Sequence, residues 1–128
     1  MKMTVLKSFK GENCAFSWCP CDGKTNIIAV ASKEGSISGF DENKGTLHIV
    51  DFDVFGSSEP HPLVSAELEN RVNCLIWGKT LPGNESYPFG IIATSYNNGT
   101  ICIWRPVLCE DNYQLHLVFI CFCFLMYR

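Results

Sequence analysis

The chain has 128 residues, of which 47% are hydrophobic and 18% charged, and its formal net charge is −3. This length fits one domain at most, the composition excludes a disordered chain, and the scattered basic residues exclude an electrostatic footprint for nucleic acid. The eight cysteines have no framework spacing and residues 1–13 lack the apolar core of a signal peptide, so we expect reduced thiols and a cytoplasmic protein.

Residues 1–12 are expected to form a lead that contains one strand, Thr4–Phe9. From residue 13 onward, two units show the same order of features. Each begins with an alternating strand that ends in Trp and continues through a loop to an apolar strand that ends in small residues. A Gly-Thr turn then leads into a third strand. The matching segments are 15–18, 27–32 and 45–52 in the first unit and 74–77, 91–95 and 99–106 in the second.

The first unit spans residues 13–69, and its third strand alternates with a period of two. Leu47 and Ile49 share one face, and His48 and Val50 lie on the other. Neither face is strongly polar, which indicates a sheet covered on both sides. Residues 36–44 interrupt this unit, 56–62 form a turn-rich connector, and Leu63–Leu68 are expected to form its outer strand.

The second unit spans residues 70–106, and its outer strand is not evident from the sequence. Its tight turn is Asn97-Asn98-Gly99-Thr100, in which Asn and Gly tolerate positive φ. This turn accounts for the glycosylation sequon at Asn98. A second sequon, at Asn84, lies in the loop 79–88, and neither carries weight without an entry signal into the secretory pathway.

The segment 107–128 contains an unbroken apolar run, Leu117–Tyr127. This run is shorter than the ~20 residues of a membrane-spanning helix, for which ~17 is the lower limit. Three interpretations stay open: a membrane anchor, the outer strand of the second unit, and sequence foreign to the repeat fold. We favour the last, such as the end of a truncated gene or of an alternative transcript.

The repeats predict an all-β fold, a fragment of a WD40-type β-propeller with about two four-stranded antiparallel blades and an apolar C-terminal tail. Matching positions lie farther apart than the ~40–45 residues of a typical WD40 repeat, by 59 residues from Trp18 to Trp77 and 54 from Gly45 to Gly99, so the loops and connectors are expected to be long. Repeat folds need about three units to cover their apolar faces. We therefore expect the isolated chain to be poorly soluble or to associate.

Pairs of cysteines suggest metal binding, but the spacing argues against it. Cys19-Pro20-Cys21 supplies two thiols and no second pair follows at a finger-like distance, while Cys121 and Cys123 lie in the tail. The three histidines lie in unrelated contexts, without a nucleophile motif that would complete a catalytic triad. They are His48, His61 and His116.

The acidic residues Asp41, Glu42, Asp51 and Asp53 lack the spacing of a calcium loop and are expected to be solvated charges. The tryptophans recur at matching positions of the repeat, which favours packing between blades over a binding surface. They are Trp18, Trp77 and Trp104. We expect no catalytic residue, cofactor-binding residue or metal ligand, and the chain is not expected to be an enzyme.

Taken in order, the motifs resemble the N-terminal propeller of the Sec-thirty-one family, the larger outer-coat subunit of coat protein complex II. The resemblance covers roughly residues 1–106. The segments that carry it are Ala15–Pro20, Gly39–Asp41, Gly45–Asp53, Leu75–Gly78 and Asn97–Ile101.

The resemblance implies a structural scaffold of the vesicle coat that moves cargo from the endoplasmic reticulum to the Golgi. The implied partners are the smaller outer-coat subunit and the inner-coat subunits, with only a peripheral association with membranes at endoplasmic reticulum exit sites and on coated vesicles. It implies no cofactor, small-molecule substrate or nucleic acid. The alternatives are a WD40 adaptor in another complex and a short protein anchored to a membrane by its tail.

Overall fold

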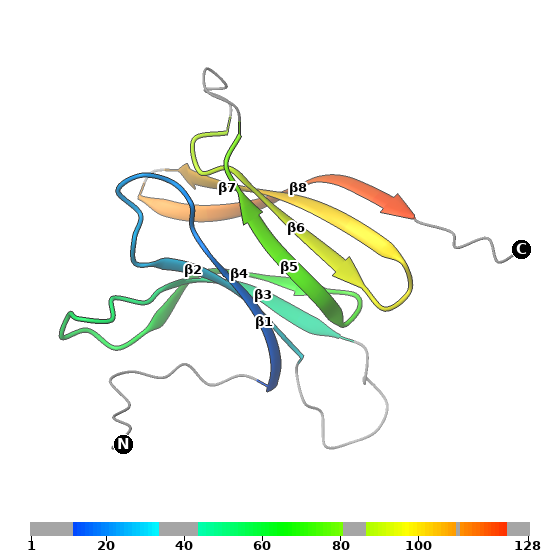
Figure 1. The fold of residues 1–128 in the computed structure, drawn as a ribbon, viewed down its shortest axis with the longest axis horizontal. Coiled ribbons are helices and arrows are strands. Elements are labelled where there is room, and N and C mark those ends of the chain that lie inside the picture. The colour runs from blue at the N-terminus through cyan, green and yellow to red at the C-terminus, as the bar shows by residue number, and fades with distance from the viewer. Residues whose placement is uncertain (1–11, 34–43, 81–86, 110, 123–128) are drawn as a thin grey trace, which may run out of the picture.

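The computed structural model of the chain describes residues 12–33, 44–80, 87–109 and 111–122 (Figure 1). Within these ranges there are eight strands and no helix. The first four strands are β1 (Glu12–Trp18), β2 (Ile27–Lys33), β3 (Gly45–Asp51) and β4 (His61–Leu68). The second four are β5 (Val72–Gly78), β6 (Ile91–Tyr96), β7 (Thr100–Cys109) and β8 (Asn112–Phe122).

The strands form two four-stranded antiparallel sheets with consecutive order, β1-β2-β3-β4 and β5-β6-β7-β8, termed sheet 1 and sheet 2. The two sheets stack so that β1 contacts β5 and β4 contacts β8. Figure 1 shows sheet 1 below sheet 2. Two antiparallel sheets with like strands adjacent confirm the predicted pair of WD40-type blades.

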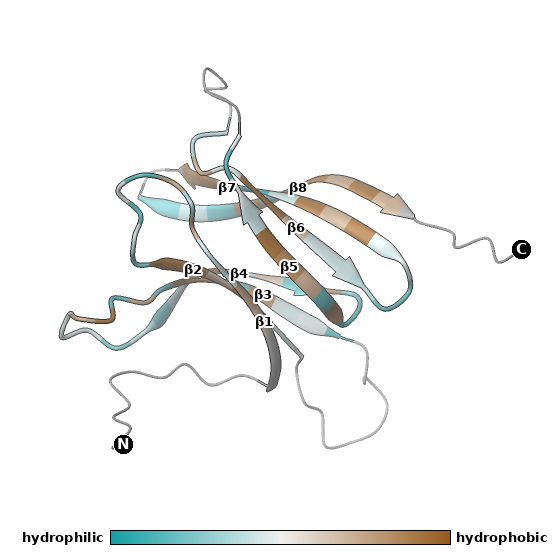
Figure 2. Cartoon of the chain, viewed as in Figure 1, coloured by the Kyte–Doolittle hydropathy of each residue, from teal (hydrophilic) through white to brown (hydrophobic). Residues whose placement is uncertain are grey.

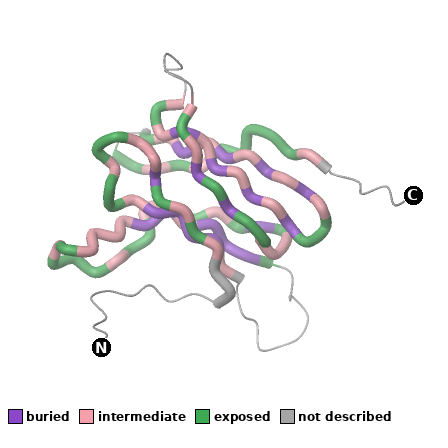
Figure 3. Tube along the Cα trace, in the orientation of Figure 1, coloured by how far each residue is buried: buried purple, intermediate pink, exposed green. Residues whose placement is uncertain are grey.

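The core lies between the two sheets, where Figure 3 shows buried residues on strands of both. Leu47 and Ile49 of β3 are fully buried there, as their shared face predicted, and so is Ile92 of β6. The other side of sheet 1 has a smaller cluster of Ile28, Val30 and Val50. Both faces of β3 therefore carry buried apolar side chains, and the half-buried His48 is a polar exception on the second face.

The turn between β6 and β7 forms as its residues predict. Gly99 has a φ of 81°, a conformation that costs glycine little, and its N–H donates to the Tyr96 carbonyl at 3.1 Å. The Asn98 side-chain oxygen accepts a hydrogen bond from the Thr100 N–H at 3.1 Å. The amide of Asn98 thus stabilises the turn, which is the structural interpretation of this sequon.

The structure differs from our favoured interpretation of segment 107–128. β7 continues to Cys109, and β8 pairs with it along its length from Asn112 to Phe122, so most of the segment completes sheet 2. A register shift between Ile103 and Trp104 of β7 interrupts the alternation. From Leu117 onward β8 is apolar on both faces, so its sequence there shows one continuous run, whereas residues 112–117 alternate between polar and apolar side chains (Figure 2).

Three further expectations fall outside the described residues: the strand Thr4–Phe9, most of the interruption 36–44 and the sequon at Asn84. Among the residues that are described, no helix is long and apolar enough to cross a membrane.

Replacing Ile49 by alanine is expected to lower the free energy of unfolding by about 2–5 kcal/mol, because the surrounding sheets cannot fully close the cavity. Phe55→Ala is the matched control, since Phe55 is 92% exposed, and its effect should stay within about 0.5 kcal/mol. Urea unfolding followed by tryptophan fluorescence measures both. Equal effects would contradict the assignment of the core.

Candidate interaction site between the two sheets

The Cys19-Pro20-Cys21 motif lies in the loop between β1 and β2. The Cys19 N–H donates to the Ile27 carbonyl at 2.9 Å, which closes the loop. Burial of the Cys19 side chain in the main core raises its pKa to about 11, so the thiol stays protonated and acts as an apolar group. Cys121 is half-buried on β8, and Cys123 lies outside the described residues.

The three histidines lie on different strands, and each bonds locally. His48 Nδ1 lies 2.7 Å from the Ser65 hydroxyl on the neighbouring strand. His61 Nδ1 donates to the Glu59 carbonyl at 3.2 Å. His116 Nδ1 accepts from Arg105 at 3.3 Å, which leaves its Nε2–H to donate to the Gln114 side chain at 3.0 Å. The fold does not bring the three rings together.

Of the candidate acidic residues that the structure describes, Asp51 lies opposite His61 in the pairing of β3 with β4. Asp51 ends β3 and Asp53 follows it, and both are partly exposed. Asp41 and Glu42 lie outside the described residues. No cluster of three or more potential metal ligands occurs among the residues that the structure describes.

The tryptophans divide into two groups. Trp77 and Trp104 are buried in the core between the sheets, as the repeat pattern predicts, whereas Trp18 is 43% exposed and meets the Phe52 ring edge-on. The Trp77 backbone N–H donates to the Ser17 hydroxyl of sheet 1 at 3.1 Å, and its indole N–H donates to the Phe89 carbonyl at 2.7 Å. Trp77 therefore links both sheets and the loop before β6.

A second set of contacts joins the sheets at the loop end. The Lys79 ammonium lies 3.1 Å from the Asp22 carboxylate, and Lys24 lies over the Phe89 ring at 5.3 Å from its centroid. Both contacts connect the loop after β1 to the loop after β5. The Lys79–Asp22 pair is exposed and therefore weak, whereas Lys24 and Phe89 are both half-buried.

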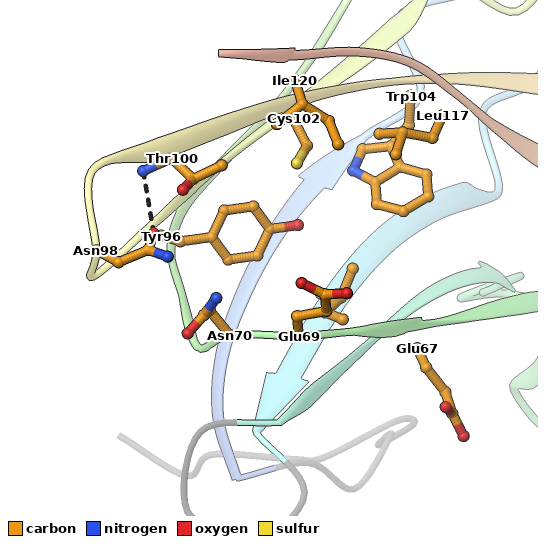
Figure 4. Close-up of a pocket in the computed structure, with 11 residues that line it drawn as sticks. Glu67, Glu69, Asn70, Tyr96, Asn98, Thr100, Cys102, Trp104, Leu117 and Ile120 are labelled. Carbon is orange, nitrogen blue, oxygen red and sulfur yellow. Dashed lines mark hydrogen bonds between the residues drawn. The ribbon is translucent and has the colours of Figure 1, made fainter. Parts of the chain in front are cut away.

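A cavity of about 230 Å³ lies between the end of sheet 1 and the face of sheet 2 (Figure 4). The end of β4 and the connector to β5 form one side, and β6, β7 and β8 form the other. Its lining residues are Glu67, Leu68, Glu69, Asn70, Tyr96, Asn98, Thr100, Cys102, Trp104, Leu117 and Ile120. We call this the inter-sheet pocket.

A chain of hydrogen bonds fixes the aromatic wall of the inter-sheet pocket. The Trp104 indole N–H donates to the Thr94 hydroxyl at 3.0 Å, and that hydroxyl donates to the Tyr96 phenol oxygen at 3.1 Å. Thr94 is fully buried, and burial raises the pKa of Tyr96 to about 12. The wall is therefore neutral and rigid at physiological pH.

The mouth of the pocket is acidic and its interior apolar. Glu67 and Glu69 are exposed on one side, and the half-exposed Leu117 and Ile120 lie on the other. The pKa of the Cys102 thiol is raised chiefly by burial, and the negative charge of Glu69 adds to this effect. Glu69 therefore acts electrostatically on the pocket interior.

One polar group inside the pocket lacks a partner. Thr100 is 7% exposed, and its hydroxyl makes no hydrogen bond with any residue that the structure describes. The combination of apolar walls, an acidic mouth and an unpartnered hydroxyl suits a side chain with an apolar stem and a positive end.

Sequence reasoning missed this pocket. Its residues come from β4, the connector and three strands of sheet 2, and no local motif joins them. The one available signal was the pair Thr94 and Tyr96, two hydroxyl groups on the same face of a strand that otherwise reads as apolar.

The cysteines are expected to react in an order that follows exposure. Cys74 is exposed, whereas Cys19 and Cys102 are buried with raised pKa values, and the thiolate is the form that attacks. Brief alkylation of the native protein with iodoacetamide should label Cys74 well before the other two. Peptide mass spectrometry measures the order, which urea should abolish. Native labelling of Cys19 as fast as Cys74 would contradict the structure.

Tyr96→Phe should lower the free energy of unfolding by about 1 kcal/mol near neutral pH, because Thr94 loses its acceptor. The folded-state pKa of about 12 lies above the ordinary value of 10.0, so folding favours the neutral phenol. The wild type should therefore lose about 2 kcal/mol relative to the variant as the pH rises from 10 to 12. Urea unfolding of both proteins across this range tests the prediction, and parallel pH curves would refute it.

No known family profile matches the chain, and no solved structure gives a significant match. Protein transport protein SEC31 of Dictyostelium discoideum is 29% identical over 112 residues, which are 85% of this chain and 8% of that protein. The protein of the same name from Pyricularia oryzae is 32% identical over 96 residues, 73% of this chain and 7% of that protein.

A third relative, protein transport protein SEC31 of Mycosarcoma maydis, is 25% identical over 107 residues, 77% of this chain and 7% of the relative. The chain thus spans less than a tenth of the length of these relatives. Over most of its own length it is similar to SEC31 proteins, which confirms the resemblance to the Sec-thirty-one family that the motifs predicted.

Proposed function

We propose that the chain acts as part of a structural scaffold of the coat on vesicles that travel from the endoplasmic reticulum to the Golgi. The observation that carries this proposal is the similarity to proteins named protein transport protein SEC31, which extends over 85% of the chain in one relative. A scaffold acts through shape and contacts, with no bound cofactor. Stacked blades with a fixed inter-sheet pocket suit that role.

The proposed partners are the smaller outer-coat subunit and the inner-coat subunits, met in the cytoplasm at endoplasmic reticulum exit sites. The inter-sheet pocket is the contact point that the geometry favours. Interfaces take most of their affinity from a few anchor side chains seated in pockets. Here the carboxylates Glu67 and Glu69 and the apolar residues Leu117 and Ile120 favour a lysine or arginine anchor from the partner.

Vesicle flotation tests this function. The full chain is mixed with vesicles that carry assembled inner coat and the smaller outer-coat subunit, and in parallel with bare vesicles of the same lipids. We expect the chain to float with the coated vesicles alone. Flotation with bare vesicles would instead support the membrane-anchored alternative, and flotation with neither would refute both.

The role of the pocket is tested in the same assay by Glu69→Lys, which places a positive charge at the mouth. We expect the affinity for coated vesicles to fall about tenfold or more, since interfacial charge pairs contribute about 1.5–7 kcal/mol. Glu59→Lys is the matched control, because Glu59 is exposed in the loop before β4 and does not line the pocket. Equal loss in both variants would show that net charge matters and the pocket does not.

A further inference from the structure

The inter-sheet pocket has more room than one basic side chain fills. A cavity of roughly 150 Å³ is enough to hold a benzene ring, and this pocket measures about 230 Å³. The stem of a lysine is a single unbranched chain of methylene groups. With its ammonium group at Glu67 and Glu69, such a stem leaves much of the apolar interior uncovered. The volume therefore indicates a second side chain, about as large as one aromatic ring.

The walls of the interior favour an aromatic ring over an aliphatic chain. Tyr96 and Trp104 line the pocket from the neighbouring strands β6 and β7. The Thr94 hydroxyl bonds to both of these side chains, which holds the two ring systems close together. Aromatic pairs are stabilised beyond the area that they bury, so a third ring beside these two is preferred to an aliphatic group of similar size.

Polar groups gather at one end of the pocket. The Thr100 side chain is 7% exposed, and its hydroxyl has no hydrogen-bond partner within the described ranges. Figure 4 shows the amides of Asn70 and Asn98 at this end, away from Trp104 and Leu117. A buried tyrosine hydroxyl usually has a hydrogen-bond partner, and a buried hydroxyl without one is costly. A ring that carries a hydroxyl group therefore suits this end better than a plain phenyl ring.

The charge at the mouth determines what lies next to the ring. Glu67 and Glu69 are exposed, and none of the described residues that line the pocket is basic. The negative charge of Glu69 contributes to the raised pKa of the Cys102 thiol, so its field reaches the interior. Consecutive residues of a chain are only about 3.8 Å apart, so a basic residue beside the ring lies within reach of these carboxylates.

We propose that the inter-sheet pocket takes a tyrosine from a protein partner, with a lysine or arginine beside it in the partner's sequence. The phenol ring fills the interior against Tyr96 and Trp104, and its hydroxyl pairs with the Thr100 hydroxyl. The basic group of the neighbouring residue meets Glu67 and Glu69. This inference deepens the proposed function, on which it rests for the choice of a protein as the partner.

Short peptides with blocked ends test the proposal on the full chain. The reference peptide is Gly-Tyr-Lys-Gly, and three matched peptides replace Tyr by Phe, Tyr by Ala, or Lys by Gln. The tryptophans of the chain are isotope-labelled, and their indole N–H signals are followed by NMR as peptide is added. Trp104 lines the pocket and Trp18 does not, so binding should shift the Trp104 signal and leave that of Trp18 unchanged.

The three replacements should weaken binding by different amounts. Tyr to Ala should cost about tenfold or more in affinity, because the buried ring is lost. Tyr to Phe should cost about two- to tenfold, because one hydrogen bond is lost. Lys to Gln should cost about two- to fivefold, as for other exposed charge pairs.

Substitutions in the chain assign these losses to residues. Thr100→Val keeps the shape of the side chain and should abolish the preference for Tyr over Phe, whereas Thr100→Ser retains the hydroxyl and should keep it. The valine variant loses a hydroxyl that has no described partner, so its fold should be unchanged, which circular dichroism and a thermal melt check. Glu69→Gln should reduce the preference for Lys over Gln. Glu59→Gln is its matched control, because Glu59 is exposed and does not line the pocket.

Three results would overturn the proposal. Equal affinity for the Tyr and Ala peptides would show that the interior takes no ring. A preference for Tyr over Phe that survives in Thr100→Val would contradict the pairing with the Thr100 hydroxyl. A Trp104 signal that no peptide shifts at millimolar concentration would exclude the pocket as a peptide site.

These outcomes are separate from those of vesicle flotation. A chain that floats with coated vesicles and binds none of the peptides would refute this inference and leave the proposed function intact. A chain that binds the peptides in the expected order and does not float would refute the coat function and leave the specificity of the pocket.

Discussion

Ala29 and Ala31 of sheet 1 share one core with Trp77 and Trp104 of sheet 2. This pairing of small with large side chains determines how closely the two sheets approach, and the rest of the structure depends on that distance. Sheets that pack face to face lie about 10 Å apart, and the small side chains of Ala29 and Ala31 leave room for large rings in a core that also holds Leu47 and Ile49. This close approach also lets the Ser17 hydroxyl reach the Trp77 backbone N–H across the interface. A larger side chain at Ala29 would separate the sheets and widen the inter-sheet pocket along their outer edge.

The architecture could be predicted because its signals are local. The alternation of side chains in β3 predicted which residues share each face of the strand. The Asn-Gly turn predicted the hairpin between β6 and β7. The end of sheet 2 could not be predicted in the same way. β8 is apolar on both faces from Leu117 to Phe122 and its pairing with β7 contains a register shift, so the period of two that marks a strand is confined to residues 112–117.

The site was less predictable than the fold, because its position depends on tertiary contacts. Glu69 precedes β5 and Ile120 lies near the end of β8, and only the stacking of the sheets brings them to one pocket. Conversely, the thiols and imidazoles that suggested chemistry have ordinary structural positions. Cys19 is a buried core residue and His48 bonds to its neighbour on the next strand, which spacing in the sequence cannot reveal.

The consecutive strand order has a consequence for how the chain folds. Every pair of hydrogen-bonded strands is also adjacent in sequence, so each sheet can form by hairpins that close short or moderate loops. Contacts between the sheets, such as β4 with β8, join residues that are much farther apart along the chain. The docking of two preformed sheets is therefore the step with the largest entropic cost, and side chains at that interface are expected to control the folding rate more than those within either sheet.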